Sequence, residues 1–153
     1  MRHRVRLALV SLILMAGCSG SPSSSPTPSS PSTKSTVLFS VTSDANERPQ
    51  SIDMAMKLAG FSLDEGRQVV MFFNVKGVTI PRNQFPADFA FQDNLPIKTQ
   101  MTELIERGLD VHVCPICMQA LDVKESDLIE GAKVTTRTNL FANIGPDTAV
   151  FTY

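Results

Sequence analysis

Two cysteines near the end of the chain have the residue type and the spacing that could do chemistry. Cys114 and Cys117 lie three positions apart in residues 110–123, DVHVCPICMQALDV, where an apolar run gives way to a helical pattern. Such a pair could be a working thiol site or half of a metal site, or the two residues could simply fill an apolar core. A disulfide between them would close a very short loop, so stabilisation alone is a poor reason for the pair.

The surroundings expected for this pair favour reactive chemistry. A strand is predicted to end near Val113, and Pro115 suits the first position of a following helix. Cys114 would then cap that helix and Cys117 would lie in its first turn, where unpaired N–H groups and the helix dipole favour an anion. We therefore expect the pKa of either thiol to be lowered. His112 would face the same side as Cys114 on a regular strand and could shuttle a proton, or it could be an ordinary packed histidine.

Soft-metal binding is an alternative for the same region. His112 and Met118 could join the two cysteines as ligands of the kind that Cu(I) favours. A structural zinc site needs a second pair of ligands, and the sequence does not contain one. We predict no resident metal and no cofactor, and no Gly-rich phosphate-binding motif occurs in the chain.

The first residues of the chain indicate export. Residues 1–20, MRHRVRLALVSLILMAGCSG, begin with a basic head, continue with a short apolar run and end in small residues before Cys18. This is the pattern of a secretory signal, and the run is too short to span a bilayer, which needs about 20 residues. LMAGC resembles the lipobox of bacterial lipoproteins, whose cysteine is acylated, with Met15 where leucine is usual. An ordinary cleaved signal with an incidental cysteine is the alternative.

These patterns divide the chain into three parts. We predict a signal peptide over residues 1–17, a lipidated Cys18 with a tether over 18–35, and one folded domain over 36–153. The tether, SGSPSSSPTPSSPSTKS after the cysteine, cannot bury enough apolar surface to offset the entropy of folding, and if extended it would reach on the order of 50 Å. We therefore expect a protein of the bacterial cell envelope, anchored to the membrane by lipid, with its domain outside the cytoplasm.

The charge balance argues against nucleic acid as a partner. The whole chain has 14 basic and 15 acidic residues, and cleavage would remove Arg2, Arg4 and Arg6. The mature chain would then carry a net charge near −4, which disfavours binding to nucleic acid or to an anionic membrane surface. With no Trp and one Tyr, the chain also lacks an aromatic platform for stacked bases.

Hydrophobic patterns predict alternating strands and helices in the folded domain. Strands are expected at 36–42, 67–75, 109–113, 134–136 and 148–153. Helical segments are expected within 43–66, ending at Gly66, and at 96–107, 125–131 and 138–145, with a long loop over 76–94. Such alternation predicts an α/β fold, a three-layer sandwich with a mostly parallel sheet covered on both faces. The cysteine pair would lie beyond the carboxyl ends of the strands, where such folds place their reactive groups.

Residues 101–136, MTELIERGLDVHVCPICMQALDVKESDLIEGAKVTT, resemble the DsrE/YchN-like family of small α/β sulfur-relay proteins. The C-x-x-C-M-x-A turn and the D-L-I-E-G-A helix stand in the expected order, and the pattern of residues 36–75 also fits. The resemblance implies a five-stranded parallel sheet, homo-oligomerisation, and a persulfide-carrying cysteine in some members. By position, Cys117 matches the family's T-C-M-D cysteine and Cys114 the one before it. Leu121 and Asp122 stand where arginine and glycine are usual.

Three functions remain open at this point. The first is an exported, membrane-anchored thiol protein that carries sulfur or exchanges disulfides with a partner protein, with sulfurtransferase or thiol-exchange activity. The second is a non-catalytic, oligomeric binding module, and the third is a soft-metal binding protein. The nucleophile is also open, because thioredoxin-like sites favour the first thiol, Cys114, whereas the family match favours Cys117. Known relays of this type are cytoplasmic, which departs from the export predicted here.

Overall fold

The computed structural model describes residues 35–153. The predicted signal peptide, the lipidation of Cys18 and all but the last residue of the tether lie outside the described residues. Within 35–153, none of the helices has both the length and the apolar character that crossing a membrane requires.

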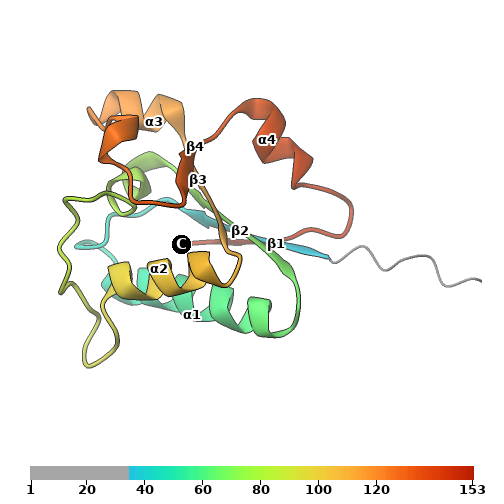
Figure 1. The fold of residues 1–153 in the computed structure, drawn as a ribbon, viewed down its shortest axis with the longest axis horizontal. Helices are drawn as coiled ribbons and strands as arrows, with labels where there is room; N and C mark the ends of the chain where they lie inside the picture. Colours follow the sequence, from blue (N-terminus) through green and yellow to red (C-terminus); the bar gives the residue numbers. More distant parts are fainter. Residues whose placement is uncertain (1–34) are drawn as a thin grey trace, which may run out of the picture. The chain divides into compact units, whose positions relative to one another are not determined.

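The described residues form a five-stranded sheet in the order β4-β3-β2-β1-β5, and every neighbouring pair of strands is parallel. This confirms the predicted α/β fold with a mostly parallel sheet (Figure 1). The elements, in chain order, are β1 (Thr36–Val41), α1 (Pro49–Asp64), β2 (Gln68–Phe73), the 3-10 helix η1 (Val75–Thr79), α2 (Ile97–Glu106), β3 (Asp110–Val113), α3 (Pro115–Ala120), the 3-10 helix η2 (Glu125–Asp127), β4 (Ala132–Val134), α4 (Arg137–Ala142) and β5 (Ala149–Thr152).

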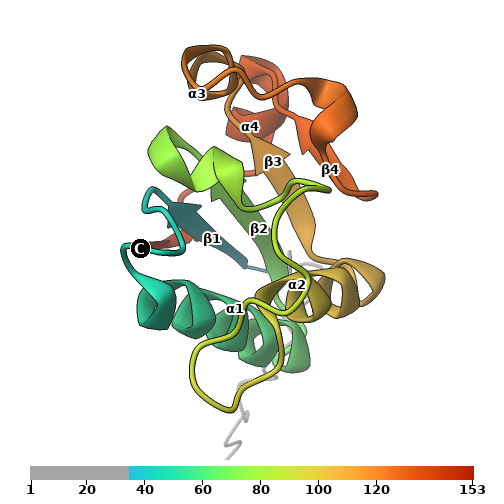
Figure 2. The ribbon, with the colours of Figure 1, turned by 90° about the vertical axis from the view of Figure 1, so that its left-hand side faces the viewer.

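The main core lies between the sheet and the pair α1 and α2. Alternate residues of the central strands face these helices, because successive side chains of a strand point to opposite faces. The fully buried members include Phe39, Met71 and Val111 from the sheet and Ile52 and Met101 from the helices. Figures 1 and 2 show α1 and α2 together on one side of the sheet and α4 on the other. The second face is covered more thinly, since α4 has no buried residue.

Local sequence signals explain where the two long helices begin and end. Pro49 opens α1 at a position where its missing N–H costs nothing. Gly66 and Gly108 follow α1 and α2 with positive φ values of 70° and 106°, the conformation that ends helices and that glycine adopts without strain. Asp122 has a φ of 51° just after α3. Aspartate is one of the few residue types other than glycine that tolerate this left-handed conformation.

The helix predicted over 125–131 is wrong, because only the three residues of η2 are helical. Leu128 is extended and forms an antiparallel bridge with Arg82. The N–H of Ile129 donates to the carbonyl of Pro81 at 3.1 Å. Pairing with a loop that is remote in the sequence thus replaces the hydrogen bonds that a helix would have made with itself.

Two smaller corrections concern segment boundaries. The segment 76–94, predicted as a loop, begins within η1. The strand predicted at 134–136 instead ends at Val134, which pairs with Val113. The remaining strands and the two long helices agree with prediction to within a few residues, and this is the usual accuracy of boundaries read from patterns.

Candidate functional site

The cysteine pair lies where β3 gives way to α3, as predicted. Cys114 is the residue before the helix and Pro115 is its first residue. The N–H of Cys114 donates to the carbonyl of Phe73 in the neighbouring strand at 2.9 Å, and the carbonyl of Cys114 accepts from the N–H of Met118 at 2.9 Å. Cys114 therefore makes the last hydrogen bond between the two strands and the first hydrogen bond of the helix. This places Cys117 about one helical turn after Cys114.

Both thiols are free and partly buried. Their side chains contact the edge of the main core, yet the Ile116 side chain between them is 77% exposed. The turn is therefore open to solvent on one side, so a molecule outside the protein can approach it. Two small apolar residues sealed in a core would not have this arrangement.

Burial is the largest influence on the pKa of Cys117, and it raises that pKa above the ordinary value. A hydrogen bond with the Cys114 thiol acts in the same direction. The N–H of Val75, 3.1 Å from the Cys117 Sγ, opposes them. The predicted lowering is therefore wrong for Cys117, because its sulfur contacts the core and a second thiol, and because a six-residue helix contributes only a small dipole.

His112 is placed in a different environment from the one predicted. Its side chain is 1% exposed, and its two ring nitrogens lie 2.8 Å from the Thr135 Oγ1 and 2.9 Å from the Asp110 Oδ2. Asp110 also forms an ion pair of 2.7 Å with Lys133 on the edge strand. Both imidazole nitrogens are thus occupied by β3 and the segment after β4, rather than directed at a thiol. The geometry gives no support to His112 as a proton shuttle.

The soft-metal ligand set is not assembled either. Among residues 35–153, no three His, Cys, Asp or Glu side chains come together as a group that could hold a metal ion. Met118, offered as a fourth ligand, is 4% exposed and packs in the main core. Because His112 bonds to Asp110 and Thr135, the sulfurs of Cys114 and Cys117 are the soft metal-binding atoms that remain at the turn.

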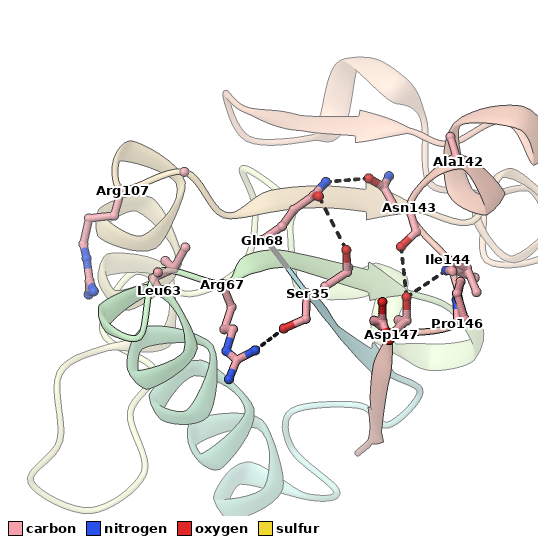
Figure 3. A pocket seen from close by; sticks show the side chains of 15 residues that line it. Ser35, Leu63, Arg67, Gln68, Arg107, Ala142, Asn143, Ile144, Pro146 and Asp147 are labelled. Carbon is pink, nitrogen blue, oxygen red and sulfur yellow. Dashed lines mark hydrogen bonds between the residues drawn. The ribbon is translucent and has the colours of Figure 1, made fainter. Parts of the chain in front are cut away.

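A large groove lies at the opposite edge of the sheet from the thiols. This groove of about 770 Å³ is lined by residues at the amino ends of the strands, among them Ser35, Gln68 and Gly108, and by the segment 142–148 (Figure 3). Its polar groups largely bond to one another: the Gln68 amide donates to Asn143 at 2.9 Å, and the Gly145 N–H donates to Thr148 at 2.8 Å. The groove therefore offers few free groups for chemistry.

The 3-10 helix η1 contributes to the site, which the patterns in the sequence did not predict. This short helix lies against α3 (Figure 2), and its first residue donates the hydrogen bond to Cys117. The useful signal was Gly77, which is buried in the middle of η1. A glycine in a segment that follows a buried strand often marks a close backbone approach, and here it allows η1 to lie against the end of β1.

The fold and the position of the cysteines define a class of protein. It is a small α/β domain with an all-parallel five-stranded sheet and two thiols where the strand β3 ends. Residues 35–152 match the model of the DsrE/DsrF-like family, and the chain belongs to this family. It is similar to an uncharacterized protein of Methanocaldococcus jannaschii, MJ0989, with 33% identity over 121 residues, which cover 78% of this chain and 99% of the relative.

Two solved structures share the fold. The crystal structure of the ychN protein from E. coli superposes with a TM-score of 0.56 at 17% identity and covers 77% of this chain and 99% of its own. The structure of MTH1491 from Methanobacterium thermoautotrophicum, a protein of unknown function, gives a TM-score of 0.55 at 16% identity, covering 78% of this chain and 100% of its own. At such identities the likeness extends to the fold alone.

Proposed function

We propose that this DsrE/DsrF-like domain is a thiol protein of the bacterial cell envelope whose cysteine pair carries sulfane sulfur. The observation that carries the proposal is the open turn at Cys114 and Cys117, with two free thiols and a backbone N–H on one sulfur. Membership in the family supports sulfur chemistry at this position. The match of Cys117 to the family cysteine makes it the carrier, with Cys114 as its neighbour.

The proposed reaction is a transfer of neutral sulfur between thiols. The Cys117 thiolate attacks the outer sulfur of a donor persulfide, R–S–SH, and the S–S bond of the donor breaks. The electron pair leaves on the donor sulfur, which takes up a proton to become a thiol, and Cys117 becomes the persulfide. No net oxidation occurs, so the step needs neither a metal nor a redox cofactor. The raised pKa leaves little thiolate at neutral pH, but a thiolate of higher pKa is intrinsically the stronger nucleophile.

Disulfide exchange with a partner protein is the second use of the same pair. A thiolate of the pair would attack the disulfide of the partner, and the other thiol would resolve the mixed disulfide. The products are a Cys114–Cys117 disulfide and a partner with two thiols. The Cys114 thiol is close enough to Cys117 to influence its pKa, and this proximity favours disulfide exchange.

Anchoring through a lipidated Cys18 completes the proposal. Because all five strands are parallel, the domain begins at the amino edge of the sheet and the thiols lie at the carboxyl edge. The tether therefore joins the domain at the end away from the site. Two or more acyl chains on one residue would give stable attachment.

A non-catalytic, oligomeric role is the other candidate, and a specific surface favours it. Edge strand β5 is exposed along its length, and α4 beside it in the sequence is exposed as well. Four large apolar side chains on these elements and the loop between them are 41–62% exposed, namely Phe141, Ile144, Val150 and Phe151. An exposed edge with apolar side chains favours contact with another chain, and we propose a second copy of this one.

Loading with polysulfide tests the sulfur-carrier proposal. The full-length protein is treated with polysulfide under native conditions, and peptide mass spectrometry locates any added sulfur. We expect one added sulfur on Cys117, its loss in Cys117→Ser, and retention of the lipid-modified protein in the membrane fraction unless Cys18 is changed to Ala. If a small alkylating agent reaches neither thiol in the native protein, and polysulfide adds no sulfur, only the binding module is left.

A further inference from the structure

Val75, the first residue of η1, has a backbone conformation that its side chain does not favour. Its φ is 49°, in the left-handed region, where a β-branched residue is strained. The Val75 side chain is 54% exposed, so packing against the core does not account for the strain. Strained residues persist where surrounding interactions hold them, and they often lie at functional sites.

The neighbouring amides are used within the fold. The N–H of Asn74 donates to the carbonyl of Val41 at 2.9 Å, and the N–H of Lys76 donates to the carbonyl of Thr42 at 3.2 Å. The N–H of Gly77 donates back to Asn74 at 2.9 Å. These bonds join the segment to the end of β1 and leave the amide of the strained residue facing the site.

The close approach of η1 to β1 depends on a missing side chain. A Cβ at Gly77 would clash with the carbonyl oxygen of Val41. The Asn74 side chain adds a further bond, since its amide donates to the Ser40 Oγ at 2.9 Å. The position of the amide at Val75 is therefore set by the sheet edge and does not depend on the cysteine turn itself.

We propose that the N–H of Val75 is a preorganised donor that stabilises negative charge on the Cys117 sulfur. This inference rests on the proposed function and assigns a part of the site that lies 42 positions away in the sequence. The donor is 3.1 Å from Sγ and held in place before any reaction begins. A fixed donor aimed at developing charge costs no reorganisation when the charge appears.

The donor acts in both halves of a sulfur transfer. During loading it stabilises the attacking thiolate of Cys117. During unloading, the thiolate of an acceptor attacks the outer sulfur of the Cys117 persulfide, the S–S bond breaks, and the electron pair returns to Sγ. The same N–H then stabilises the leaving thiolate. Val75 thus acts directly on the reacting sulfur through its main-chain N–H, so the identity of its side chain matters little.

Replacing one backbone atom tests this role. The α-hydroxy analogue of valine at position 75, introduced into the full-length chain, converts the amide to an ester and removes the N–H while keeping the side chain. The readout is the pH profile of Cys117 alkylation by iodoacetamide, resolved by peptide mass spectrometry in a Cys114→Ser background. We expect the pKa of Cys117 to rise by about one unit, and its alkylation at neutral pH to slow about tenfold, since hydrogen bonds to charged groups are the stronger ones.

Two controls separate this effect from a general loss of structure. An ester at Lys76 removes an N–H that bonds to Thr42, so it should weaken the fold without changing the pKa of Cys117. An ester at Gly145 removes an N–H that bonds to Thr148 at the opposite edge of the sheet, so the alkylation profile of Cys117 should match that of the parent. An unchanged pKa in the Val75 ester, with Cys117 still reactive, would overturn the role of the amide alone. A Cys117 that no pH makes reactive would overturn both this inference and the sulfur-carrier proposal.

Discussion

At the scale of single residues, Cys114 and Cys117 have different hydrogen-bond partners because different segments surround them. Cys114 uses its main chain to end a strand and begin a helix, whereas the Cys117 sulfur receives an N–H from another segment. Burial and the neighbouring thiol raise the pKa of Cys117. Two cysteines that look equivalent in the sequence therefore differ in the structure, and Cys117 is the candidate sulfur carrier.

Asp110 carries the clearest pH dependence outside the thiol site. Burial opposes ionisation, but hydrogen bonds from Lys133 and His112, with their charges, lower the pKa of Asp110 overall. A carboxyl group whose pKa is lower in the folded state than in the unfolded state stabilises the fold at pH values above its unfolded pKa. That stability is lost as the pH falls through about 4 toward the folded pKa.

We expect Asp110→Asn to lower the free energy of unfolding by about 1–2 kcal/mol at neutral pH, because His112 and Lys133 lose an ionised partner. Urea unfolding at several pH values measures this, and the difference from the parent should shrink below about pH 4. Asp88→Asn is the control, since Asp88 is exposed and makes no ion pair within residues 35–153. Equal loss in both variants would contradict the assigned role of Asp110.

At the scale of elements, the site is built where three segments meet. β3 leads into Cys114, α3 carries Cys117 in its first turn, and η1 supplies the donor. The parallel arrangement brings these segments together, because the carboxyl ends of neighbouring strands lie at one edge. The position of η1 against β1 is therefore as important to the site as the cysteine turn.

Gly77→Ala tests how tightly η1 is held. The added methyl group would meet the Val41 carbonyl, so we expect a loss of about 1–3 kcal/mol in the free energy of unfolding, as for other overpacked sites. Thermal and urea unfolding measure the loss. Gly145→Ala is the matched control, because nothing lies within 4 Å of the added atom, and its effect should stay within about 0.5 kcal/mol. A Gly77 variant as stable as this control would show that η1 can shift freely.

At the scale of the whole molecule, the two edges of the sheet have different properties. The amino edge carries the start of the domain and a large groove whose polar groups are mostly paired. The carboxyl edge carries the thiols and the end of the chain, where Tyr153 donates its N–H to Ser40 and accepts from Thr42. Along the side, β5 leaves an exposed strand with apolar residues on both faces.

If β5 and α4 bind a second copy, a charge on this surface will weaken the association. Val150 is 57% exposed, and we expect Val150→Asp to raise the dissociation constant at least tenfold, since buried central contacts contribute most to interfaces. Sedimentation velocity over a range of concentrations measures the change, and circular dichroism confirms the fold. Phe61→Asp, on an equally exposed apolar residue of α1, should leave the association unchanged. A parent protein that stays monomeric would contradict the proposed interface.

The sequence by itself determined the class of fold and the place of the thiols. Apolar β-rich runs and helical spacing are local, so they predicted the strands, with β4 displaced along the chain, both long helices, and Cys114 as the cap before a helix that begins at Pro115. The motif around Cys117 was likewise local enough to indicate the family. These features depend on neighbouring residues, and neighbouring residues are what a sequence displays.

Only the tertiary structure decided the chemical surroundings of those thiols. The donor at Val75, the bond of His112 to Thr135 and the extended form of Leu128 each depend on segments that are distant in the chain. A main-chain donor such as the N–H of Val75 has no residue-type signature, so the sequence did not show which segment would contact the Cys117 sulfur. The direction of the pKa shift at Cys117 follows from burial and from these contacts, and it was therefore fixed only when the chain folded.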